Sequence, residues 1–141
     1  NQLVSPLLSD PTVVMTTLVN RIKTIEDYQN TNIAKTVLDN SGNAIYFSRS
    51  PIPHISESEI EGKKVYKHIG MYGYKKDFLL KFIEMKRSIL EKYESLEQLR
   101  VLENGHDIKA VETQYETINV DTYEALNKVR TIMEAGSGQE S

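Results

Sequence analysis

The sequence contains no cysteine and no long hydrophobic run. Without cysteine there is no disulfide framework, no thiolate zinc site and no cysteine nucleophile, and this composition fits a reducing cytoplasm. Apolar runs such as residues 13–15 are only a few residues long, far below the roughly 20 residues that a membrane-spanning helix needs. We therefore expect no membrane partner and a cytoplasmic location.

The sequence also has no large excess of charge of either sign. Seventeen Lys and Arg residues oppose twenty Asp and Glu residues, which gives a net charge of −3. The two signs alternate along the chain, so no basic stripe indicates nucleic acid as a partner. With 39% apolar and 26% charged residues in 141, the composition is typical of one globular domain. We expect this domain over residues 1–135 and a flexible tail over residues 136–141, which lack apolar side chains.

The first half of the sequence predicts strands. Residues 13–19 are rich in β-branched side chains, which favour a strand, and residues 21–32 are predicted to be an irregular excursion. Residues 33–38 and 44–49 flank a segment rich in Asn and Gly, the residue types that tight turns favour. This pattern predicts a β-hairpin.

The second half predicts one long strand followed mainly by helices. Residues 65–75 alternate, which places Tyr66, His68, Gly70, Tyr72 and Tyr74 on one face of a strand. Residues 77–85 and 88–103 have helical spacing, residues 108–113 alternate again as a strand, and a last helix begins at residue 121. The expected apolar stripes of the second and last helices are Ile89, Tyr93, Leu96 and Leu99, and Leu126, Val129 and Met133. The expected class is mixed α/β.

Asp121 is the first candidate for chemistry. With Glu124 three residues later it forms a capping-box pattern at the start of a helix. A carboxylate in this position is also the kind of hard oxygen ligand that Mg²⁺ binds, beside water and phosphate. Both interpretations stay open, since one side chain can serve both purposes.

Several other polar residues are candidates for binding. His68 and Tyr72 share a strand face with the small Gly70 between them, so they either line a polar pocket or satisfy each other in a half-buried sheet. Arg49 ends a predicted strand before a proline, where its guanidinium either clamps a carboxylate or phosphate or remains solvated. Glu97 lies at the edge of a helical stripe, a weaker signal for contact with sugar hydroxyls. The spacing of the three histidines matches no zinc motif.

Four blocks of the sequence together resemble one known family. They are Phe47-Ser-Arg-Ser-Pro-Ile-Pro53, Tyr66-Lys-His-Ile-Gly-Met-Tyr-Gly-Tyr74, Leu90-Glu91 with Leu96-Glu-Gln-Leu-Arg100, and Val120-Asp-Thr122. In this order and approximate spacing, they resemble the 3-deoxy-manno-octulosonate cytidylyltransferases, or CMP-Kdo synthetases. The blocks that start at Tyr66 and Leu96 are the most specific.

The resemblance implies a doubly wound α/β fold with a dimerising β insertion. It implies transfer of CMP from CTP to the anomeric hydroxyl of the sugar acid Kdo, with Mg²⁺, in lipopolysaccharide biosynthesis. By this resemblance Asp121 is a magnesium ligand, and Asp121 and Arg49 are the catalytic residues. The sugar-acid site would be lined by Arg49, His68, Tyr72, Glu97 and Gln98.

Two motifs of the family are missing from this sequence: the Gly- and Arg-containing loop that holds the triphosphate, and a Gln-Gly-Asp-Glu-Pro segment with a second metal carboxylate. We therefore expect the chain to correspond to the C-terminal portion of such an enzyme. As an isolated chain it should self-associate as a homodimer, with elements exchanged between the copies, and should neither bind CTP tightly nor turn over. The alternatives are a non-catalytic sugar-acid-binding or assembly module and a sialic-acid-type cytidylyltransferase.

Overall fold

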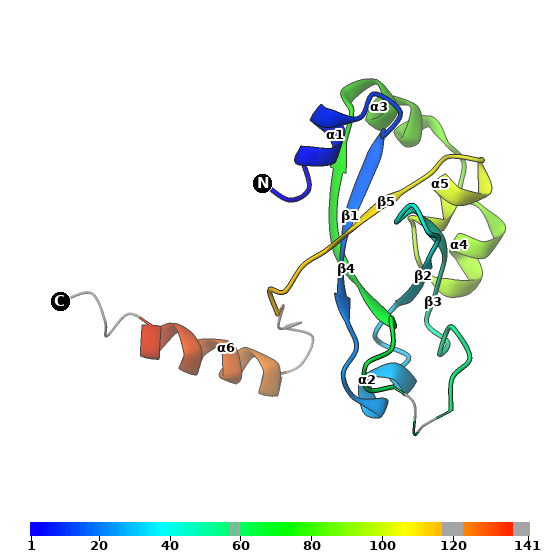
Figure 1. Ribbon diagram of the computed structural model, residues 1–141. Helices are drawn as coiled ribbons and strands as arrows, with labels where there is room; N and C mark the ends of the chain where they lie inside the picture. Colours follow the sequence, from blue (N-terminus) through cyan, green and yellow to red (C-terminus); the bar gives the residue numbers. More distant parts are fainter. Residues whose placement is uncertain (57, 59, 117–122, 137–141) are drawn as a thin grey trace.

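A computed structural model describes residues 1–56, 58, 60–116 and 123–136 of the chain. It consists of a five-stranded sheet with helices (Figure 1). The elements are α1 (Ser5–Ser9), β1 (Met15–Arg21), α2 (Ile25–Gln29), β2 (Lys35–Leu38), β3 (Ala44–Ser48), β4 (Tyr66–Tyr74), α3 (Lys76–Glu84), α4 (Ile89–Glu94), α5 (Leu99–Glu103), β5 (Lys109–Glu112) and α6 (Tyr123–Gly136). Within these ranges, we find no helix with the length and apolarity needed to cross a membrane.

The sheet has the strand order β3-β2-β4-β1-β5. Its pairs are antiparallel except for the parallel pair of β1 and β5. The predicted hairpin is confirmed: the carboxylate of Asp39 accepts the backbone N–H groups of Ser41 and Asn43, and Gly42 has a φ of 82°. This positive φ is one that glycine adopts without strain.

The tip of the hairpin also pairs with β5, at the opposite end of the strand order. The N–H of Ala44 donates to the carbonyl of Ile108, and the N–H of Ala110 donates to the carbonyl of Gly42, both at 2.9 Å. The sheet therefore curls until its two outer strands meet near the turn (Figure 1).

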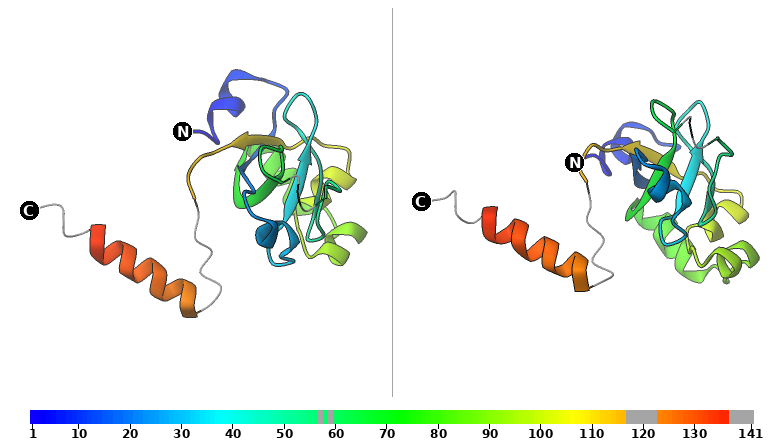
Figure 2. Two further views of the ribbon diagram at one scale, coloured as in Figure 1. Left: turned by 60° about the horizontal axis from the view of Figure 1, so that its bottom comes forward. Right: turned by 90° about the horizontal axis from the view of Figure 1, so that it is seen from below.

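The main core lies between the sheet and the helices α3, α4 and α5, which gather on one side of it (Figure 2). Phe47 of β3, Leu99 and Val101 of α5, and Ile108 have no exposed surface. Burial of these apolar side chains is the main force that holds α5 against the sheet.

The prediction of one continuous helix over residues 88–103 is wrong. The chain leaves α4 at Ser95, which has a left-handed φ of 54°, and α5 begins at Leu99. The predicted stripe holds only in part: Leu96 and Leu99 are buried, but Ile89 is 63% exposed and Tyr93 is 80% exposed. The polar Glu91 is buried in their place, since Arg100 of α5 pairs with it across the break.

Two other segments differ from the prediction. The excursion predicted for residues 21–32 contains the helix α2, whose first turn is capped when Thr24 Oγ1 accepts the N–H of Asp27. The last helix is confirmed over α6, yet Ile132 and Met133 of its apolar side are 57% and 69% exposed. Figures 1 and 2 show α6 apart from the sheet. Its predicted start at Asp121 lies outside the described residues, as does the predicted tail beyond Gly136.

Candidate functional site

An irregularity between β1 and β4 shapes the candidate site. Thr17 lies opposite Tyr72 and Leu18 lies opposite Ile69, so Gly70 and Met71 have no partner on β1. The hydroxyl of Thr17 bridges the irregularity, because it contacts the carbonyl of Met71 at 2.9 Å and Nε2 of His68 at 2.8 Å. A bulge of this kind re-aims side chains, and here it leaves His68 and Tyr72 side by side, with ring centroids 5.5 Å apart.

Gly70 does not make the room that its sequence position suggests. A Cβ atom at Gly70 would meet nothing within 4 Å, because the irregular segment turns this residue to the exposed side. The close approach is at Gly73, where a Cβ atom would lie 2.5 Å from Oγ1 of Thr16. The strand therefore needs its second glycine and tolerates a side chain at the first.

Gln98, from the turn between α4 and α5, forms hydrogen bonds with the side chains of both His68 and Tyr72. Its side-chain carbonyl accepts the hydroxyl of Tyr72 at 3.2 Å, and its amide nitrogen lies 3.4 Å from Nδ1 of His68. Gln98 is 2% exposed, so these bonds replace those it would make to water. We call Thr17, His68, Tyr72 and Gln98 the polar cluster.

With the amide nitrogen of Gln98 placed toward Nδ1, the hydrogen bonds of the polar cluster assign one tautomer to His68. The amide of Gln98 can only donate to Nδ1, so the ring proton is on Nε2 and is donated to Thr17, whose own proton goes to the carbonyl of Met71. Burial lowers the pKa of His68 to about 4. At neutral pH the imidazole is therefore uncharged.

Two tyrosines of β4, Tyr72 and Tyr74, are also uncharged at neutral pH. Burial, and then the negative charge of Glu97, raises the pKa of Tyr72. The same two causes raise the pKa of Tyr74 to about 12. The polar cluster thus consists of side chains that are uncharged at neutral pH, and its shifted pKa values do not suit proton transfer there.

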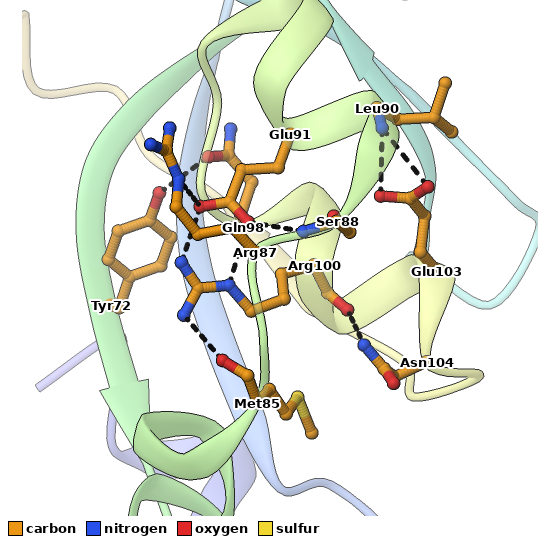
Figure 3. Close-up of polar contacts among 10 residues, drawn as sticks. All are labelled: Tyr72, Met85, Arg87, Ser88, Leu90, Glu91, Gln98, Arg100, Glu103 and Asn104. Atoms are coloured by element: carbon orange, nitrogen blue, oxygen red, sulfur yellow. Dashed lines mark hydrogen bonds and ion pairs between the residues drawn. The ribbon is translucent and has the colours of Figure 1, made fainter.

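The turn that carries Gln98 is held by a buried ion pair (Figure 3). The carboxylate of Glu91 accepts Nε of Arg100 at 2.8 Å, Nη2 of Arg100 at 2.5 Å and the backbone N–H of Ser88 at 3.0 Å. The bonds from Arg100 lower the pKa of Glu91 to about 2. This two-point contact fixes α5 against α4 and so sets where the turn places Gln98.

Arg49 directly follows β3, and its side chain contacts the beginning of the same turn. Its Nε donates to the carbonyl of Glu94 at 2.8 Å, and Nη2 donates to the carbonyl of Ser95 at 3.3 Å. Nη1 lies 3.3 and 3.4 Å from the carbonyls of Thr31 and Asn32. The guanidinium thus meets the C-terminal end of α4, where a cation is stabilised by the helix dipole.

The other predicted site residues lie apart from the polar cluster or outside the described chain. Glu97 is exposed on the turn next to Gln98. Asp121 lies outside the described residues, among which no group of three or more acidic, His or Cys side chains is placed to hold a metal ion. Sequence reasoning missed Thr17, Glu91 and Arg100, because a threonine in a strand and a charge pair in a helix are common surface patterns.

Comparison with known proteins decides the family. A family model described as cytidylyltransferase matches residues 1–108. The chain belongs to the cytidylyltransferase family.

The chain is 47% identical over 138 residues to a 3-deoxy-manno-octulosonate cytidylyltransferase of Geotalea uraniireducens (strain Rf4), across 92% of the chain and 55% of that protein. It is 47% identical over 139 residues to the enzyme of the same name from Pelobacter propionicus (strain DSM 2379 / NBRC 103807 / OttBd1), across 92% of the chain and 54% of that protein. The chain therefore spans about half the length of the curated relatives it matches.

A solved structure of CMP:2-keto-3-deoxy-manno-octonic acid synthetase complexed with CTP has the same fold. It superimposes with a TM-score of 0.85 at 34% identity, over 95% of this chain and 54% of that protein. The predicted resemblance and the mixed α/β class are thus confirmed. The predicted dimerising insertion stays a prediction.

Proposed function

We propose that this chain supplies the sugar-acid-binding half of a CMP-Kdo synthetase, which transfers CMP from CTP to Kdo and releases pyrophosphate. The observation that carries the proposal is the polar cluster. It joins His68 and Tyr72, from one of the most specific blocks of the resemblance, to Gln98 from the other. Two sequence blocks 30 residues apart thereby meet in one place.

The chemistry of these residues suits a polyhydroxylated acid. The hydroxyl oxygen of Tyr72 would accept a hydrogen bond from a sugar hydroxyl beside the ring of His68, whose two nitrogens already bond Thr17 and Gln98. Exposed Glu97 would accept further hydrogen bonds from the sugar. The Nη atoms of Arg49 make only long contacts of 3.3 and 3.4 Å, so a ligand carboxylate can replace them while Nε stays bound at 2.8 Å.

The reaction needs positioning more than acid–base chemistry. The sugar hydroxyl attacks the α-phosphorus of CTP, and pyrophosphate leaves from the opposite side. Because the pKa of His68 is about 4, this residue would act at neutral pH by orienting the sugar rather than by carrying a proton. Rate enhancement would come from holding the hydroxyl in line with the phosphate.

Asp121 is the one residue of this chain that we propose as a magnesium ligand. Mg²⁺, when bound, would neutralise phosphate charge and activate the attacking hydroxyl. A single carboxylate makes a weak site, so we expect this chain to bind CTP weakly and not to turn over. A cytoplasmic location, a place in lipopolysaccharide biosynthesis and a homodimer with exchanged elements are further parts of the proposal.

Calorimetry tests the proposal directly. The chain is titrated with Kdo and then with CTP and Mg²⁺, with a sialic acid as the competing sugar acid. We expect heat of binding from Kdo, none from the sialic acid at the same concentration, and little from CTP. A Gln98→Ala variant should lose Kdo binding, and the matched control Gln114→Ala, outside the polar cluster, should retain it. Binding of the sialic acid in preference to Kdo, or no binding of either, would refute the sugar assignment.

A further inference from the structure

Lys35 of β2 is a charged residue with no exposed surface. Its Nζ atom donates to the carbonyls of Asn30 at 2.7 Å, Ile33 at 2.6 Å and Arg49 at 2.6 Å. An ammonium group has three N–H bonds, so every donor of Lys35 has its own acceptor. Such complete pairing is what allows the ammonium group of a lysine to be buried.

These three carbonyls come from two segments that meet at Arg49. Asn30 and Ile33 flank the loop after α2, and Arg49 directly follows β3. The guanidinium of Arg49 contacts the carbonyls of Thr31 and Asn32 in that same loop. Lys35 therefore holds the backbone at Arg49 and the loop against which the Arg49 side chain lies.

Glu94 completes the arrangement from the helical side. Its carboxylate accepts the N–H of Arg49 at 2.9 Å and the hydroxyl of Ser48 at 2.7 Å. Burial raises the pKa of Glu94, but these bonds and that from Tyr46 outweigh it and keep the group ionised. Two cations thus lie near one carboxylate, which leaves positive charge at the place proposed for a ligand carboxylate.

We propose that Lys35 is a positioning residue for Arg49: by fixing the Arg49 carbonyl and the loop at residues 30–33, it aims the guanidinium at the carboxylate of the sugar acid. This inference rests on the proposed function. Lys35 itself is buried and does not touch the ligand. Its effect should therefore be specific for the acid group of the sugar rather than for its hydroxyl groups.

The test uses Lys35→Met, which fills a similar volume but has no donor. Lys67→Met is the matched control, because Lys67 lies opposite Lys35 in the register of β2 and β4 and its Nζ atom forms a long ion pair with Asp27, at 3.9 Å. Affinity is measured for Kdo and for its C1 amide. We expect Lys35→Met to weaken Kdo binding by roughly ten- to a hundredfold and to leave amide binding within about twofold of the unmodified chain. Lys67→Met should change neither.

A second measurement separates this inference from the proposed function. In ¹H–¹⁵N NMR spectra, the Nε–H of Arg49 should be protected from exchange by its bond to the Glu94 carbonyl, and Lys35→Met should accelerate that exchange at least about tenfold. If the unmodified chain binds no Kdo, the proposed function fails, and the exchange rate still decides whether Lys35 positions Arg49.

Three results would overturn the inference. The first is an unchanged exchange rate at Arg49 in a folded Lys35→Met variant. The second is equal loss of affinity for the acid and the amide. The third is loss of the folded state in both Lys35→Met and Lys35→Arg, since Lys35 would then hold the fold and not Arg49 in particular.

Discussion

Replacing Glu91 by Gln should cost this protein about 3 kcal/mol of unfolding free energy at pH 7. The substitution keeps the shape of the side chain but removes the charge that Arg100 binds at 2.8 and 2.5 Å. Glu91 is 3% exposed, so water screens the pair little. Breaking a buried pair by removing one partner typically costs about 3–5 kcal/mol.

The pKa of Glu91 gives the same magnitude independently. Its fall from the ordinary value of 4.5 to about 2 corresponds to about 3 kcal/mol of stabilisation. The folded-state pKa is the lower one, so this stabilisation is complete above pH 4.5 and disappears as the pH falls through about 2. The stability difference between the unmodified chain and Glu91→Gln should therefore narrow to about 1 kcal/mol at pH 3.

Urea unfolding followed by circular dichroism measures this difference at pH 7 and pH 3. Glu103→Gln is the control, because Glu103 is an exposed carboxylate that accepts only the backbone N–H of Leu90, at 3.2 Å. The control should change stability by less than about 0.5 kcal/mol. A Glu91→Gln variant within about 1 kcal/mol of the unmodified chain at pH 7, or a difference independent of pH, would refute the reasoning.

Two further predictions concern β4. In an NMR titration, His68 should stay neutral, with its proton on Nε2, until the pH approaches about 4. Because the pKa of His68 is lower in the folded chain than in the unfolded chain, protonation of the unfolded chain below pH 6.5 should lower the free energy of unfolding. A measured pKa near 6.5 would contradict the burial of this side chain. Gly73→Ala should lower the free energy of unfolding by about 1–3 kcal/mol, because the new Cβ atom would clash with Thr16. A lower melting temperature would report this loss. Gly70→Ala, which meets nothing within 4 Å, should be close to neutral, and equal losses for both variants would contradict the register.

Local patterns predicted the elements whose causes are local. The alternation in residues 65–75 predicted β4, and the Asn and Gly residues between residues 38 and 44 predicted the hairpin. The sequence blocks beginning at Tyr66 and Leu96 indicated the family, because whole motifs carry more information than single polar residues do.

Local patterns did not predict features that depend on interactions between residues distant in the sequence. Helical spacing treats Ile89 and Tyr93 as core, but the helix breaks at Ser95, and the pairing of Glu91 with Arg100 across the break buries Glu91 instead. In the same way, His68 and Tyr72 were placed on one face by alternation, but their link to Thr17 depends on an irregularity in the register with β1. The predicted role of Asp121 lies outside the described residues and stays a prediction.

The meeting of the hairpin tip with β5 affects how two copies of this chain can touch. Outer strands normally present free backbone groups to which a strand of another molecule can add. Here the N–H groups of Ala44 and Ala110 already donate across the closure. Strand addition at this position would first have to break both bonds, so the closure protects this part of the two outer strands from pairing with another molecule.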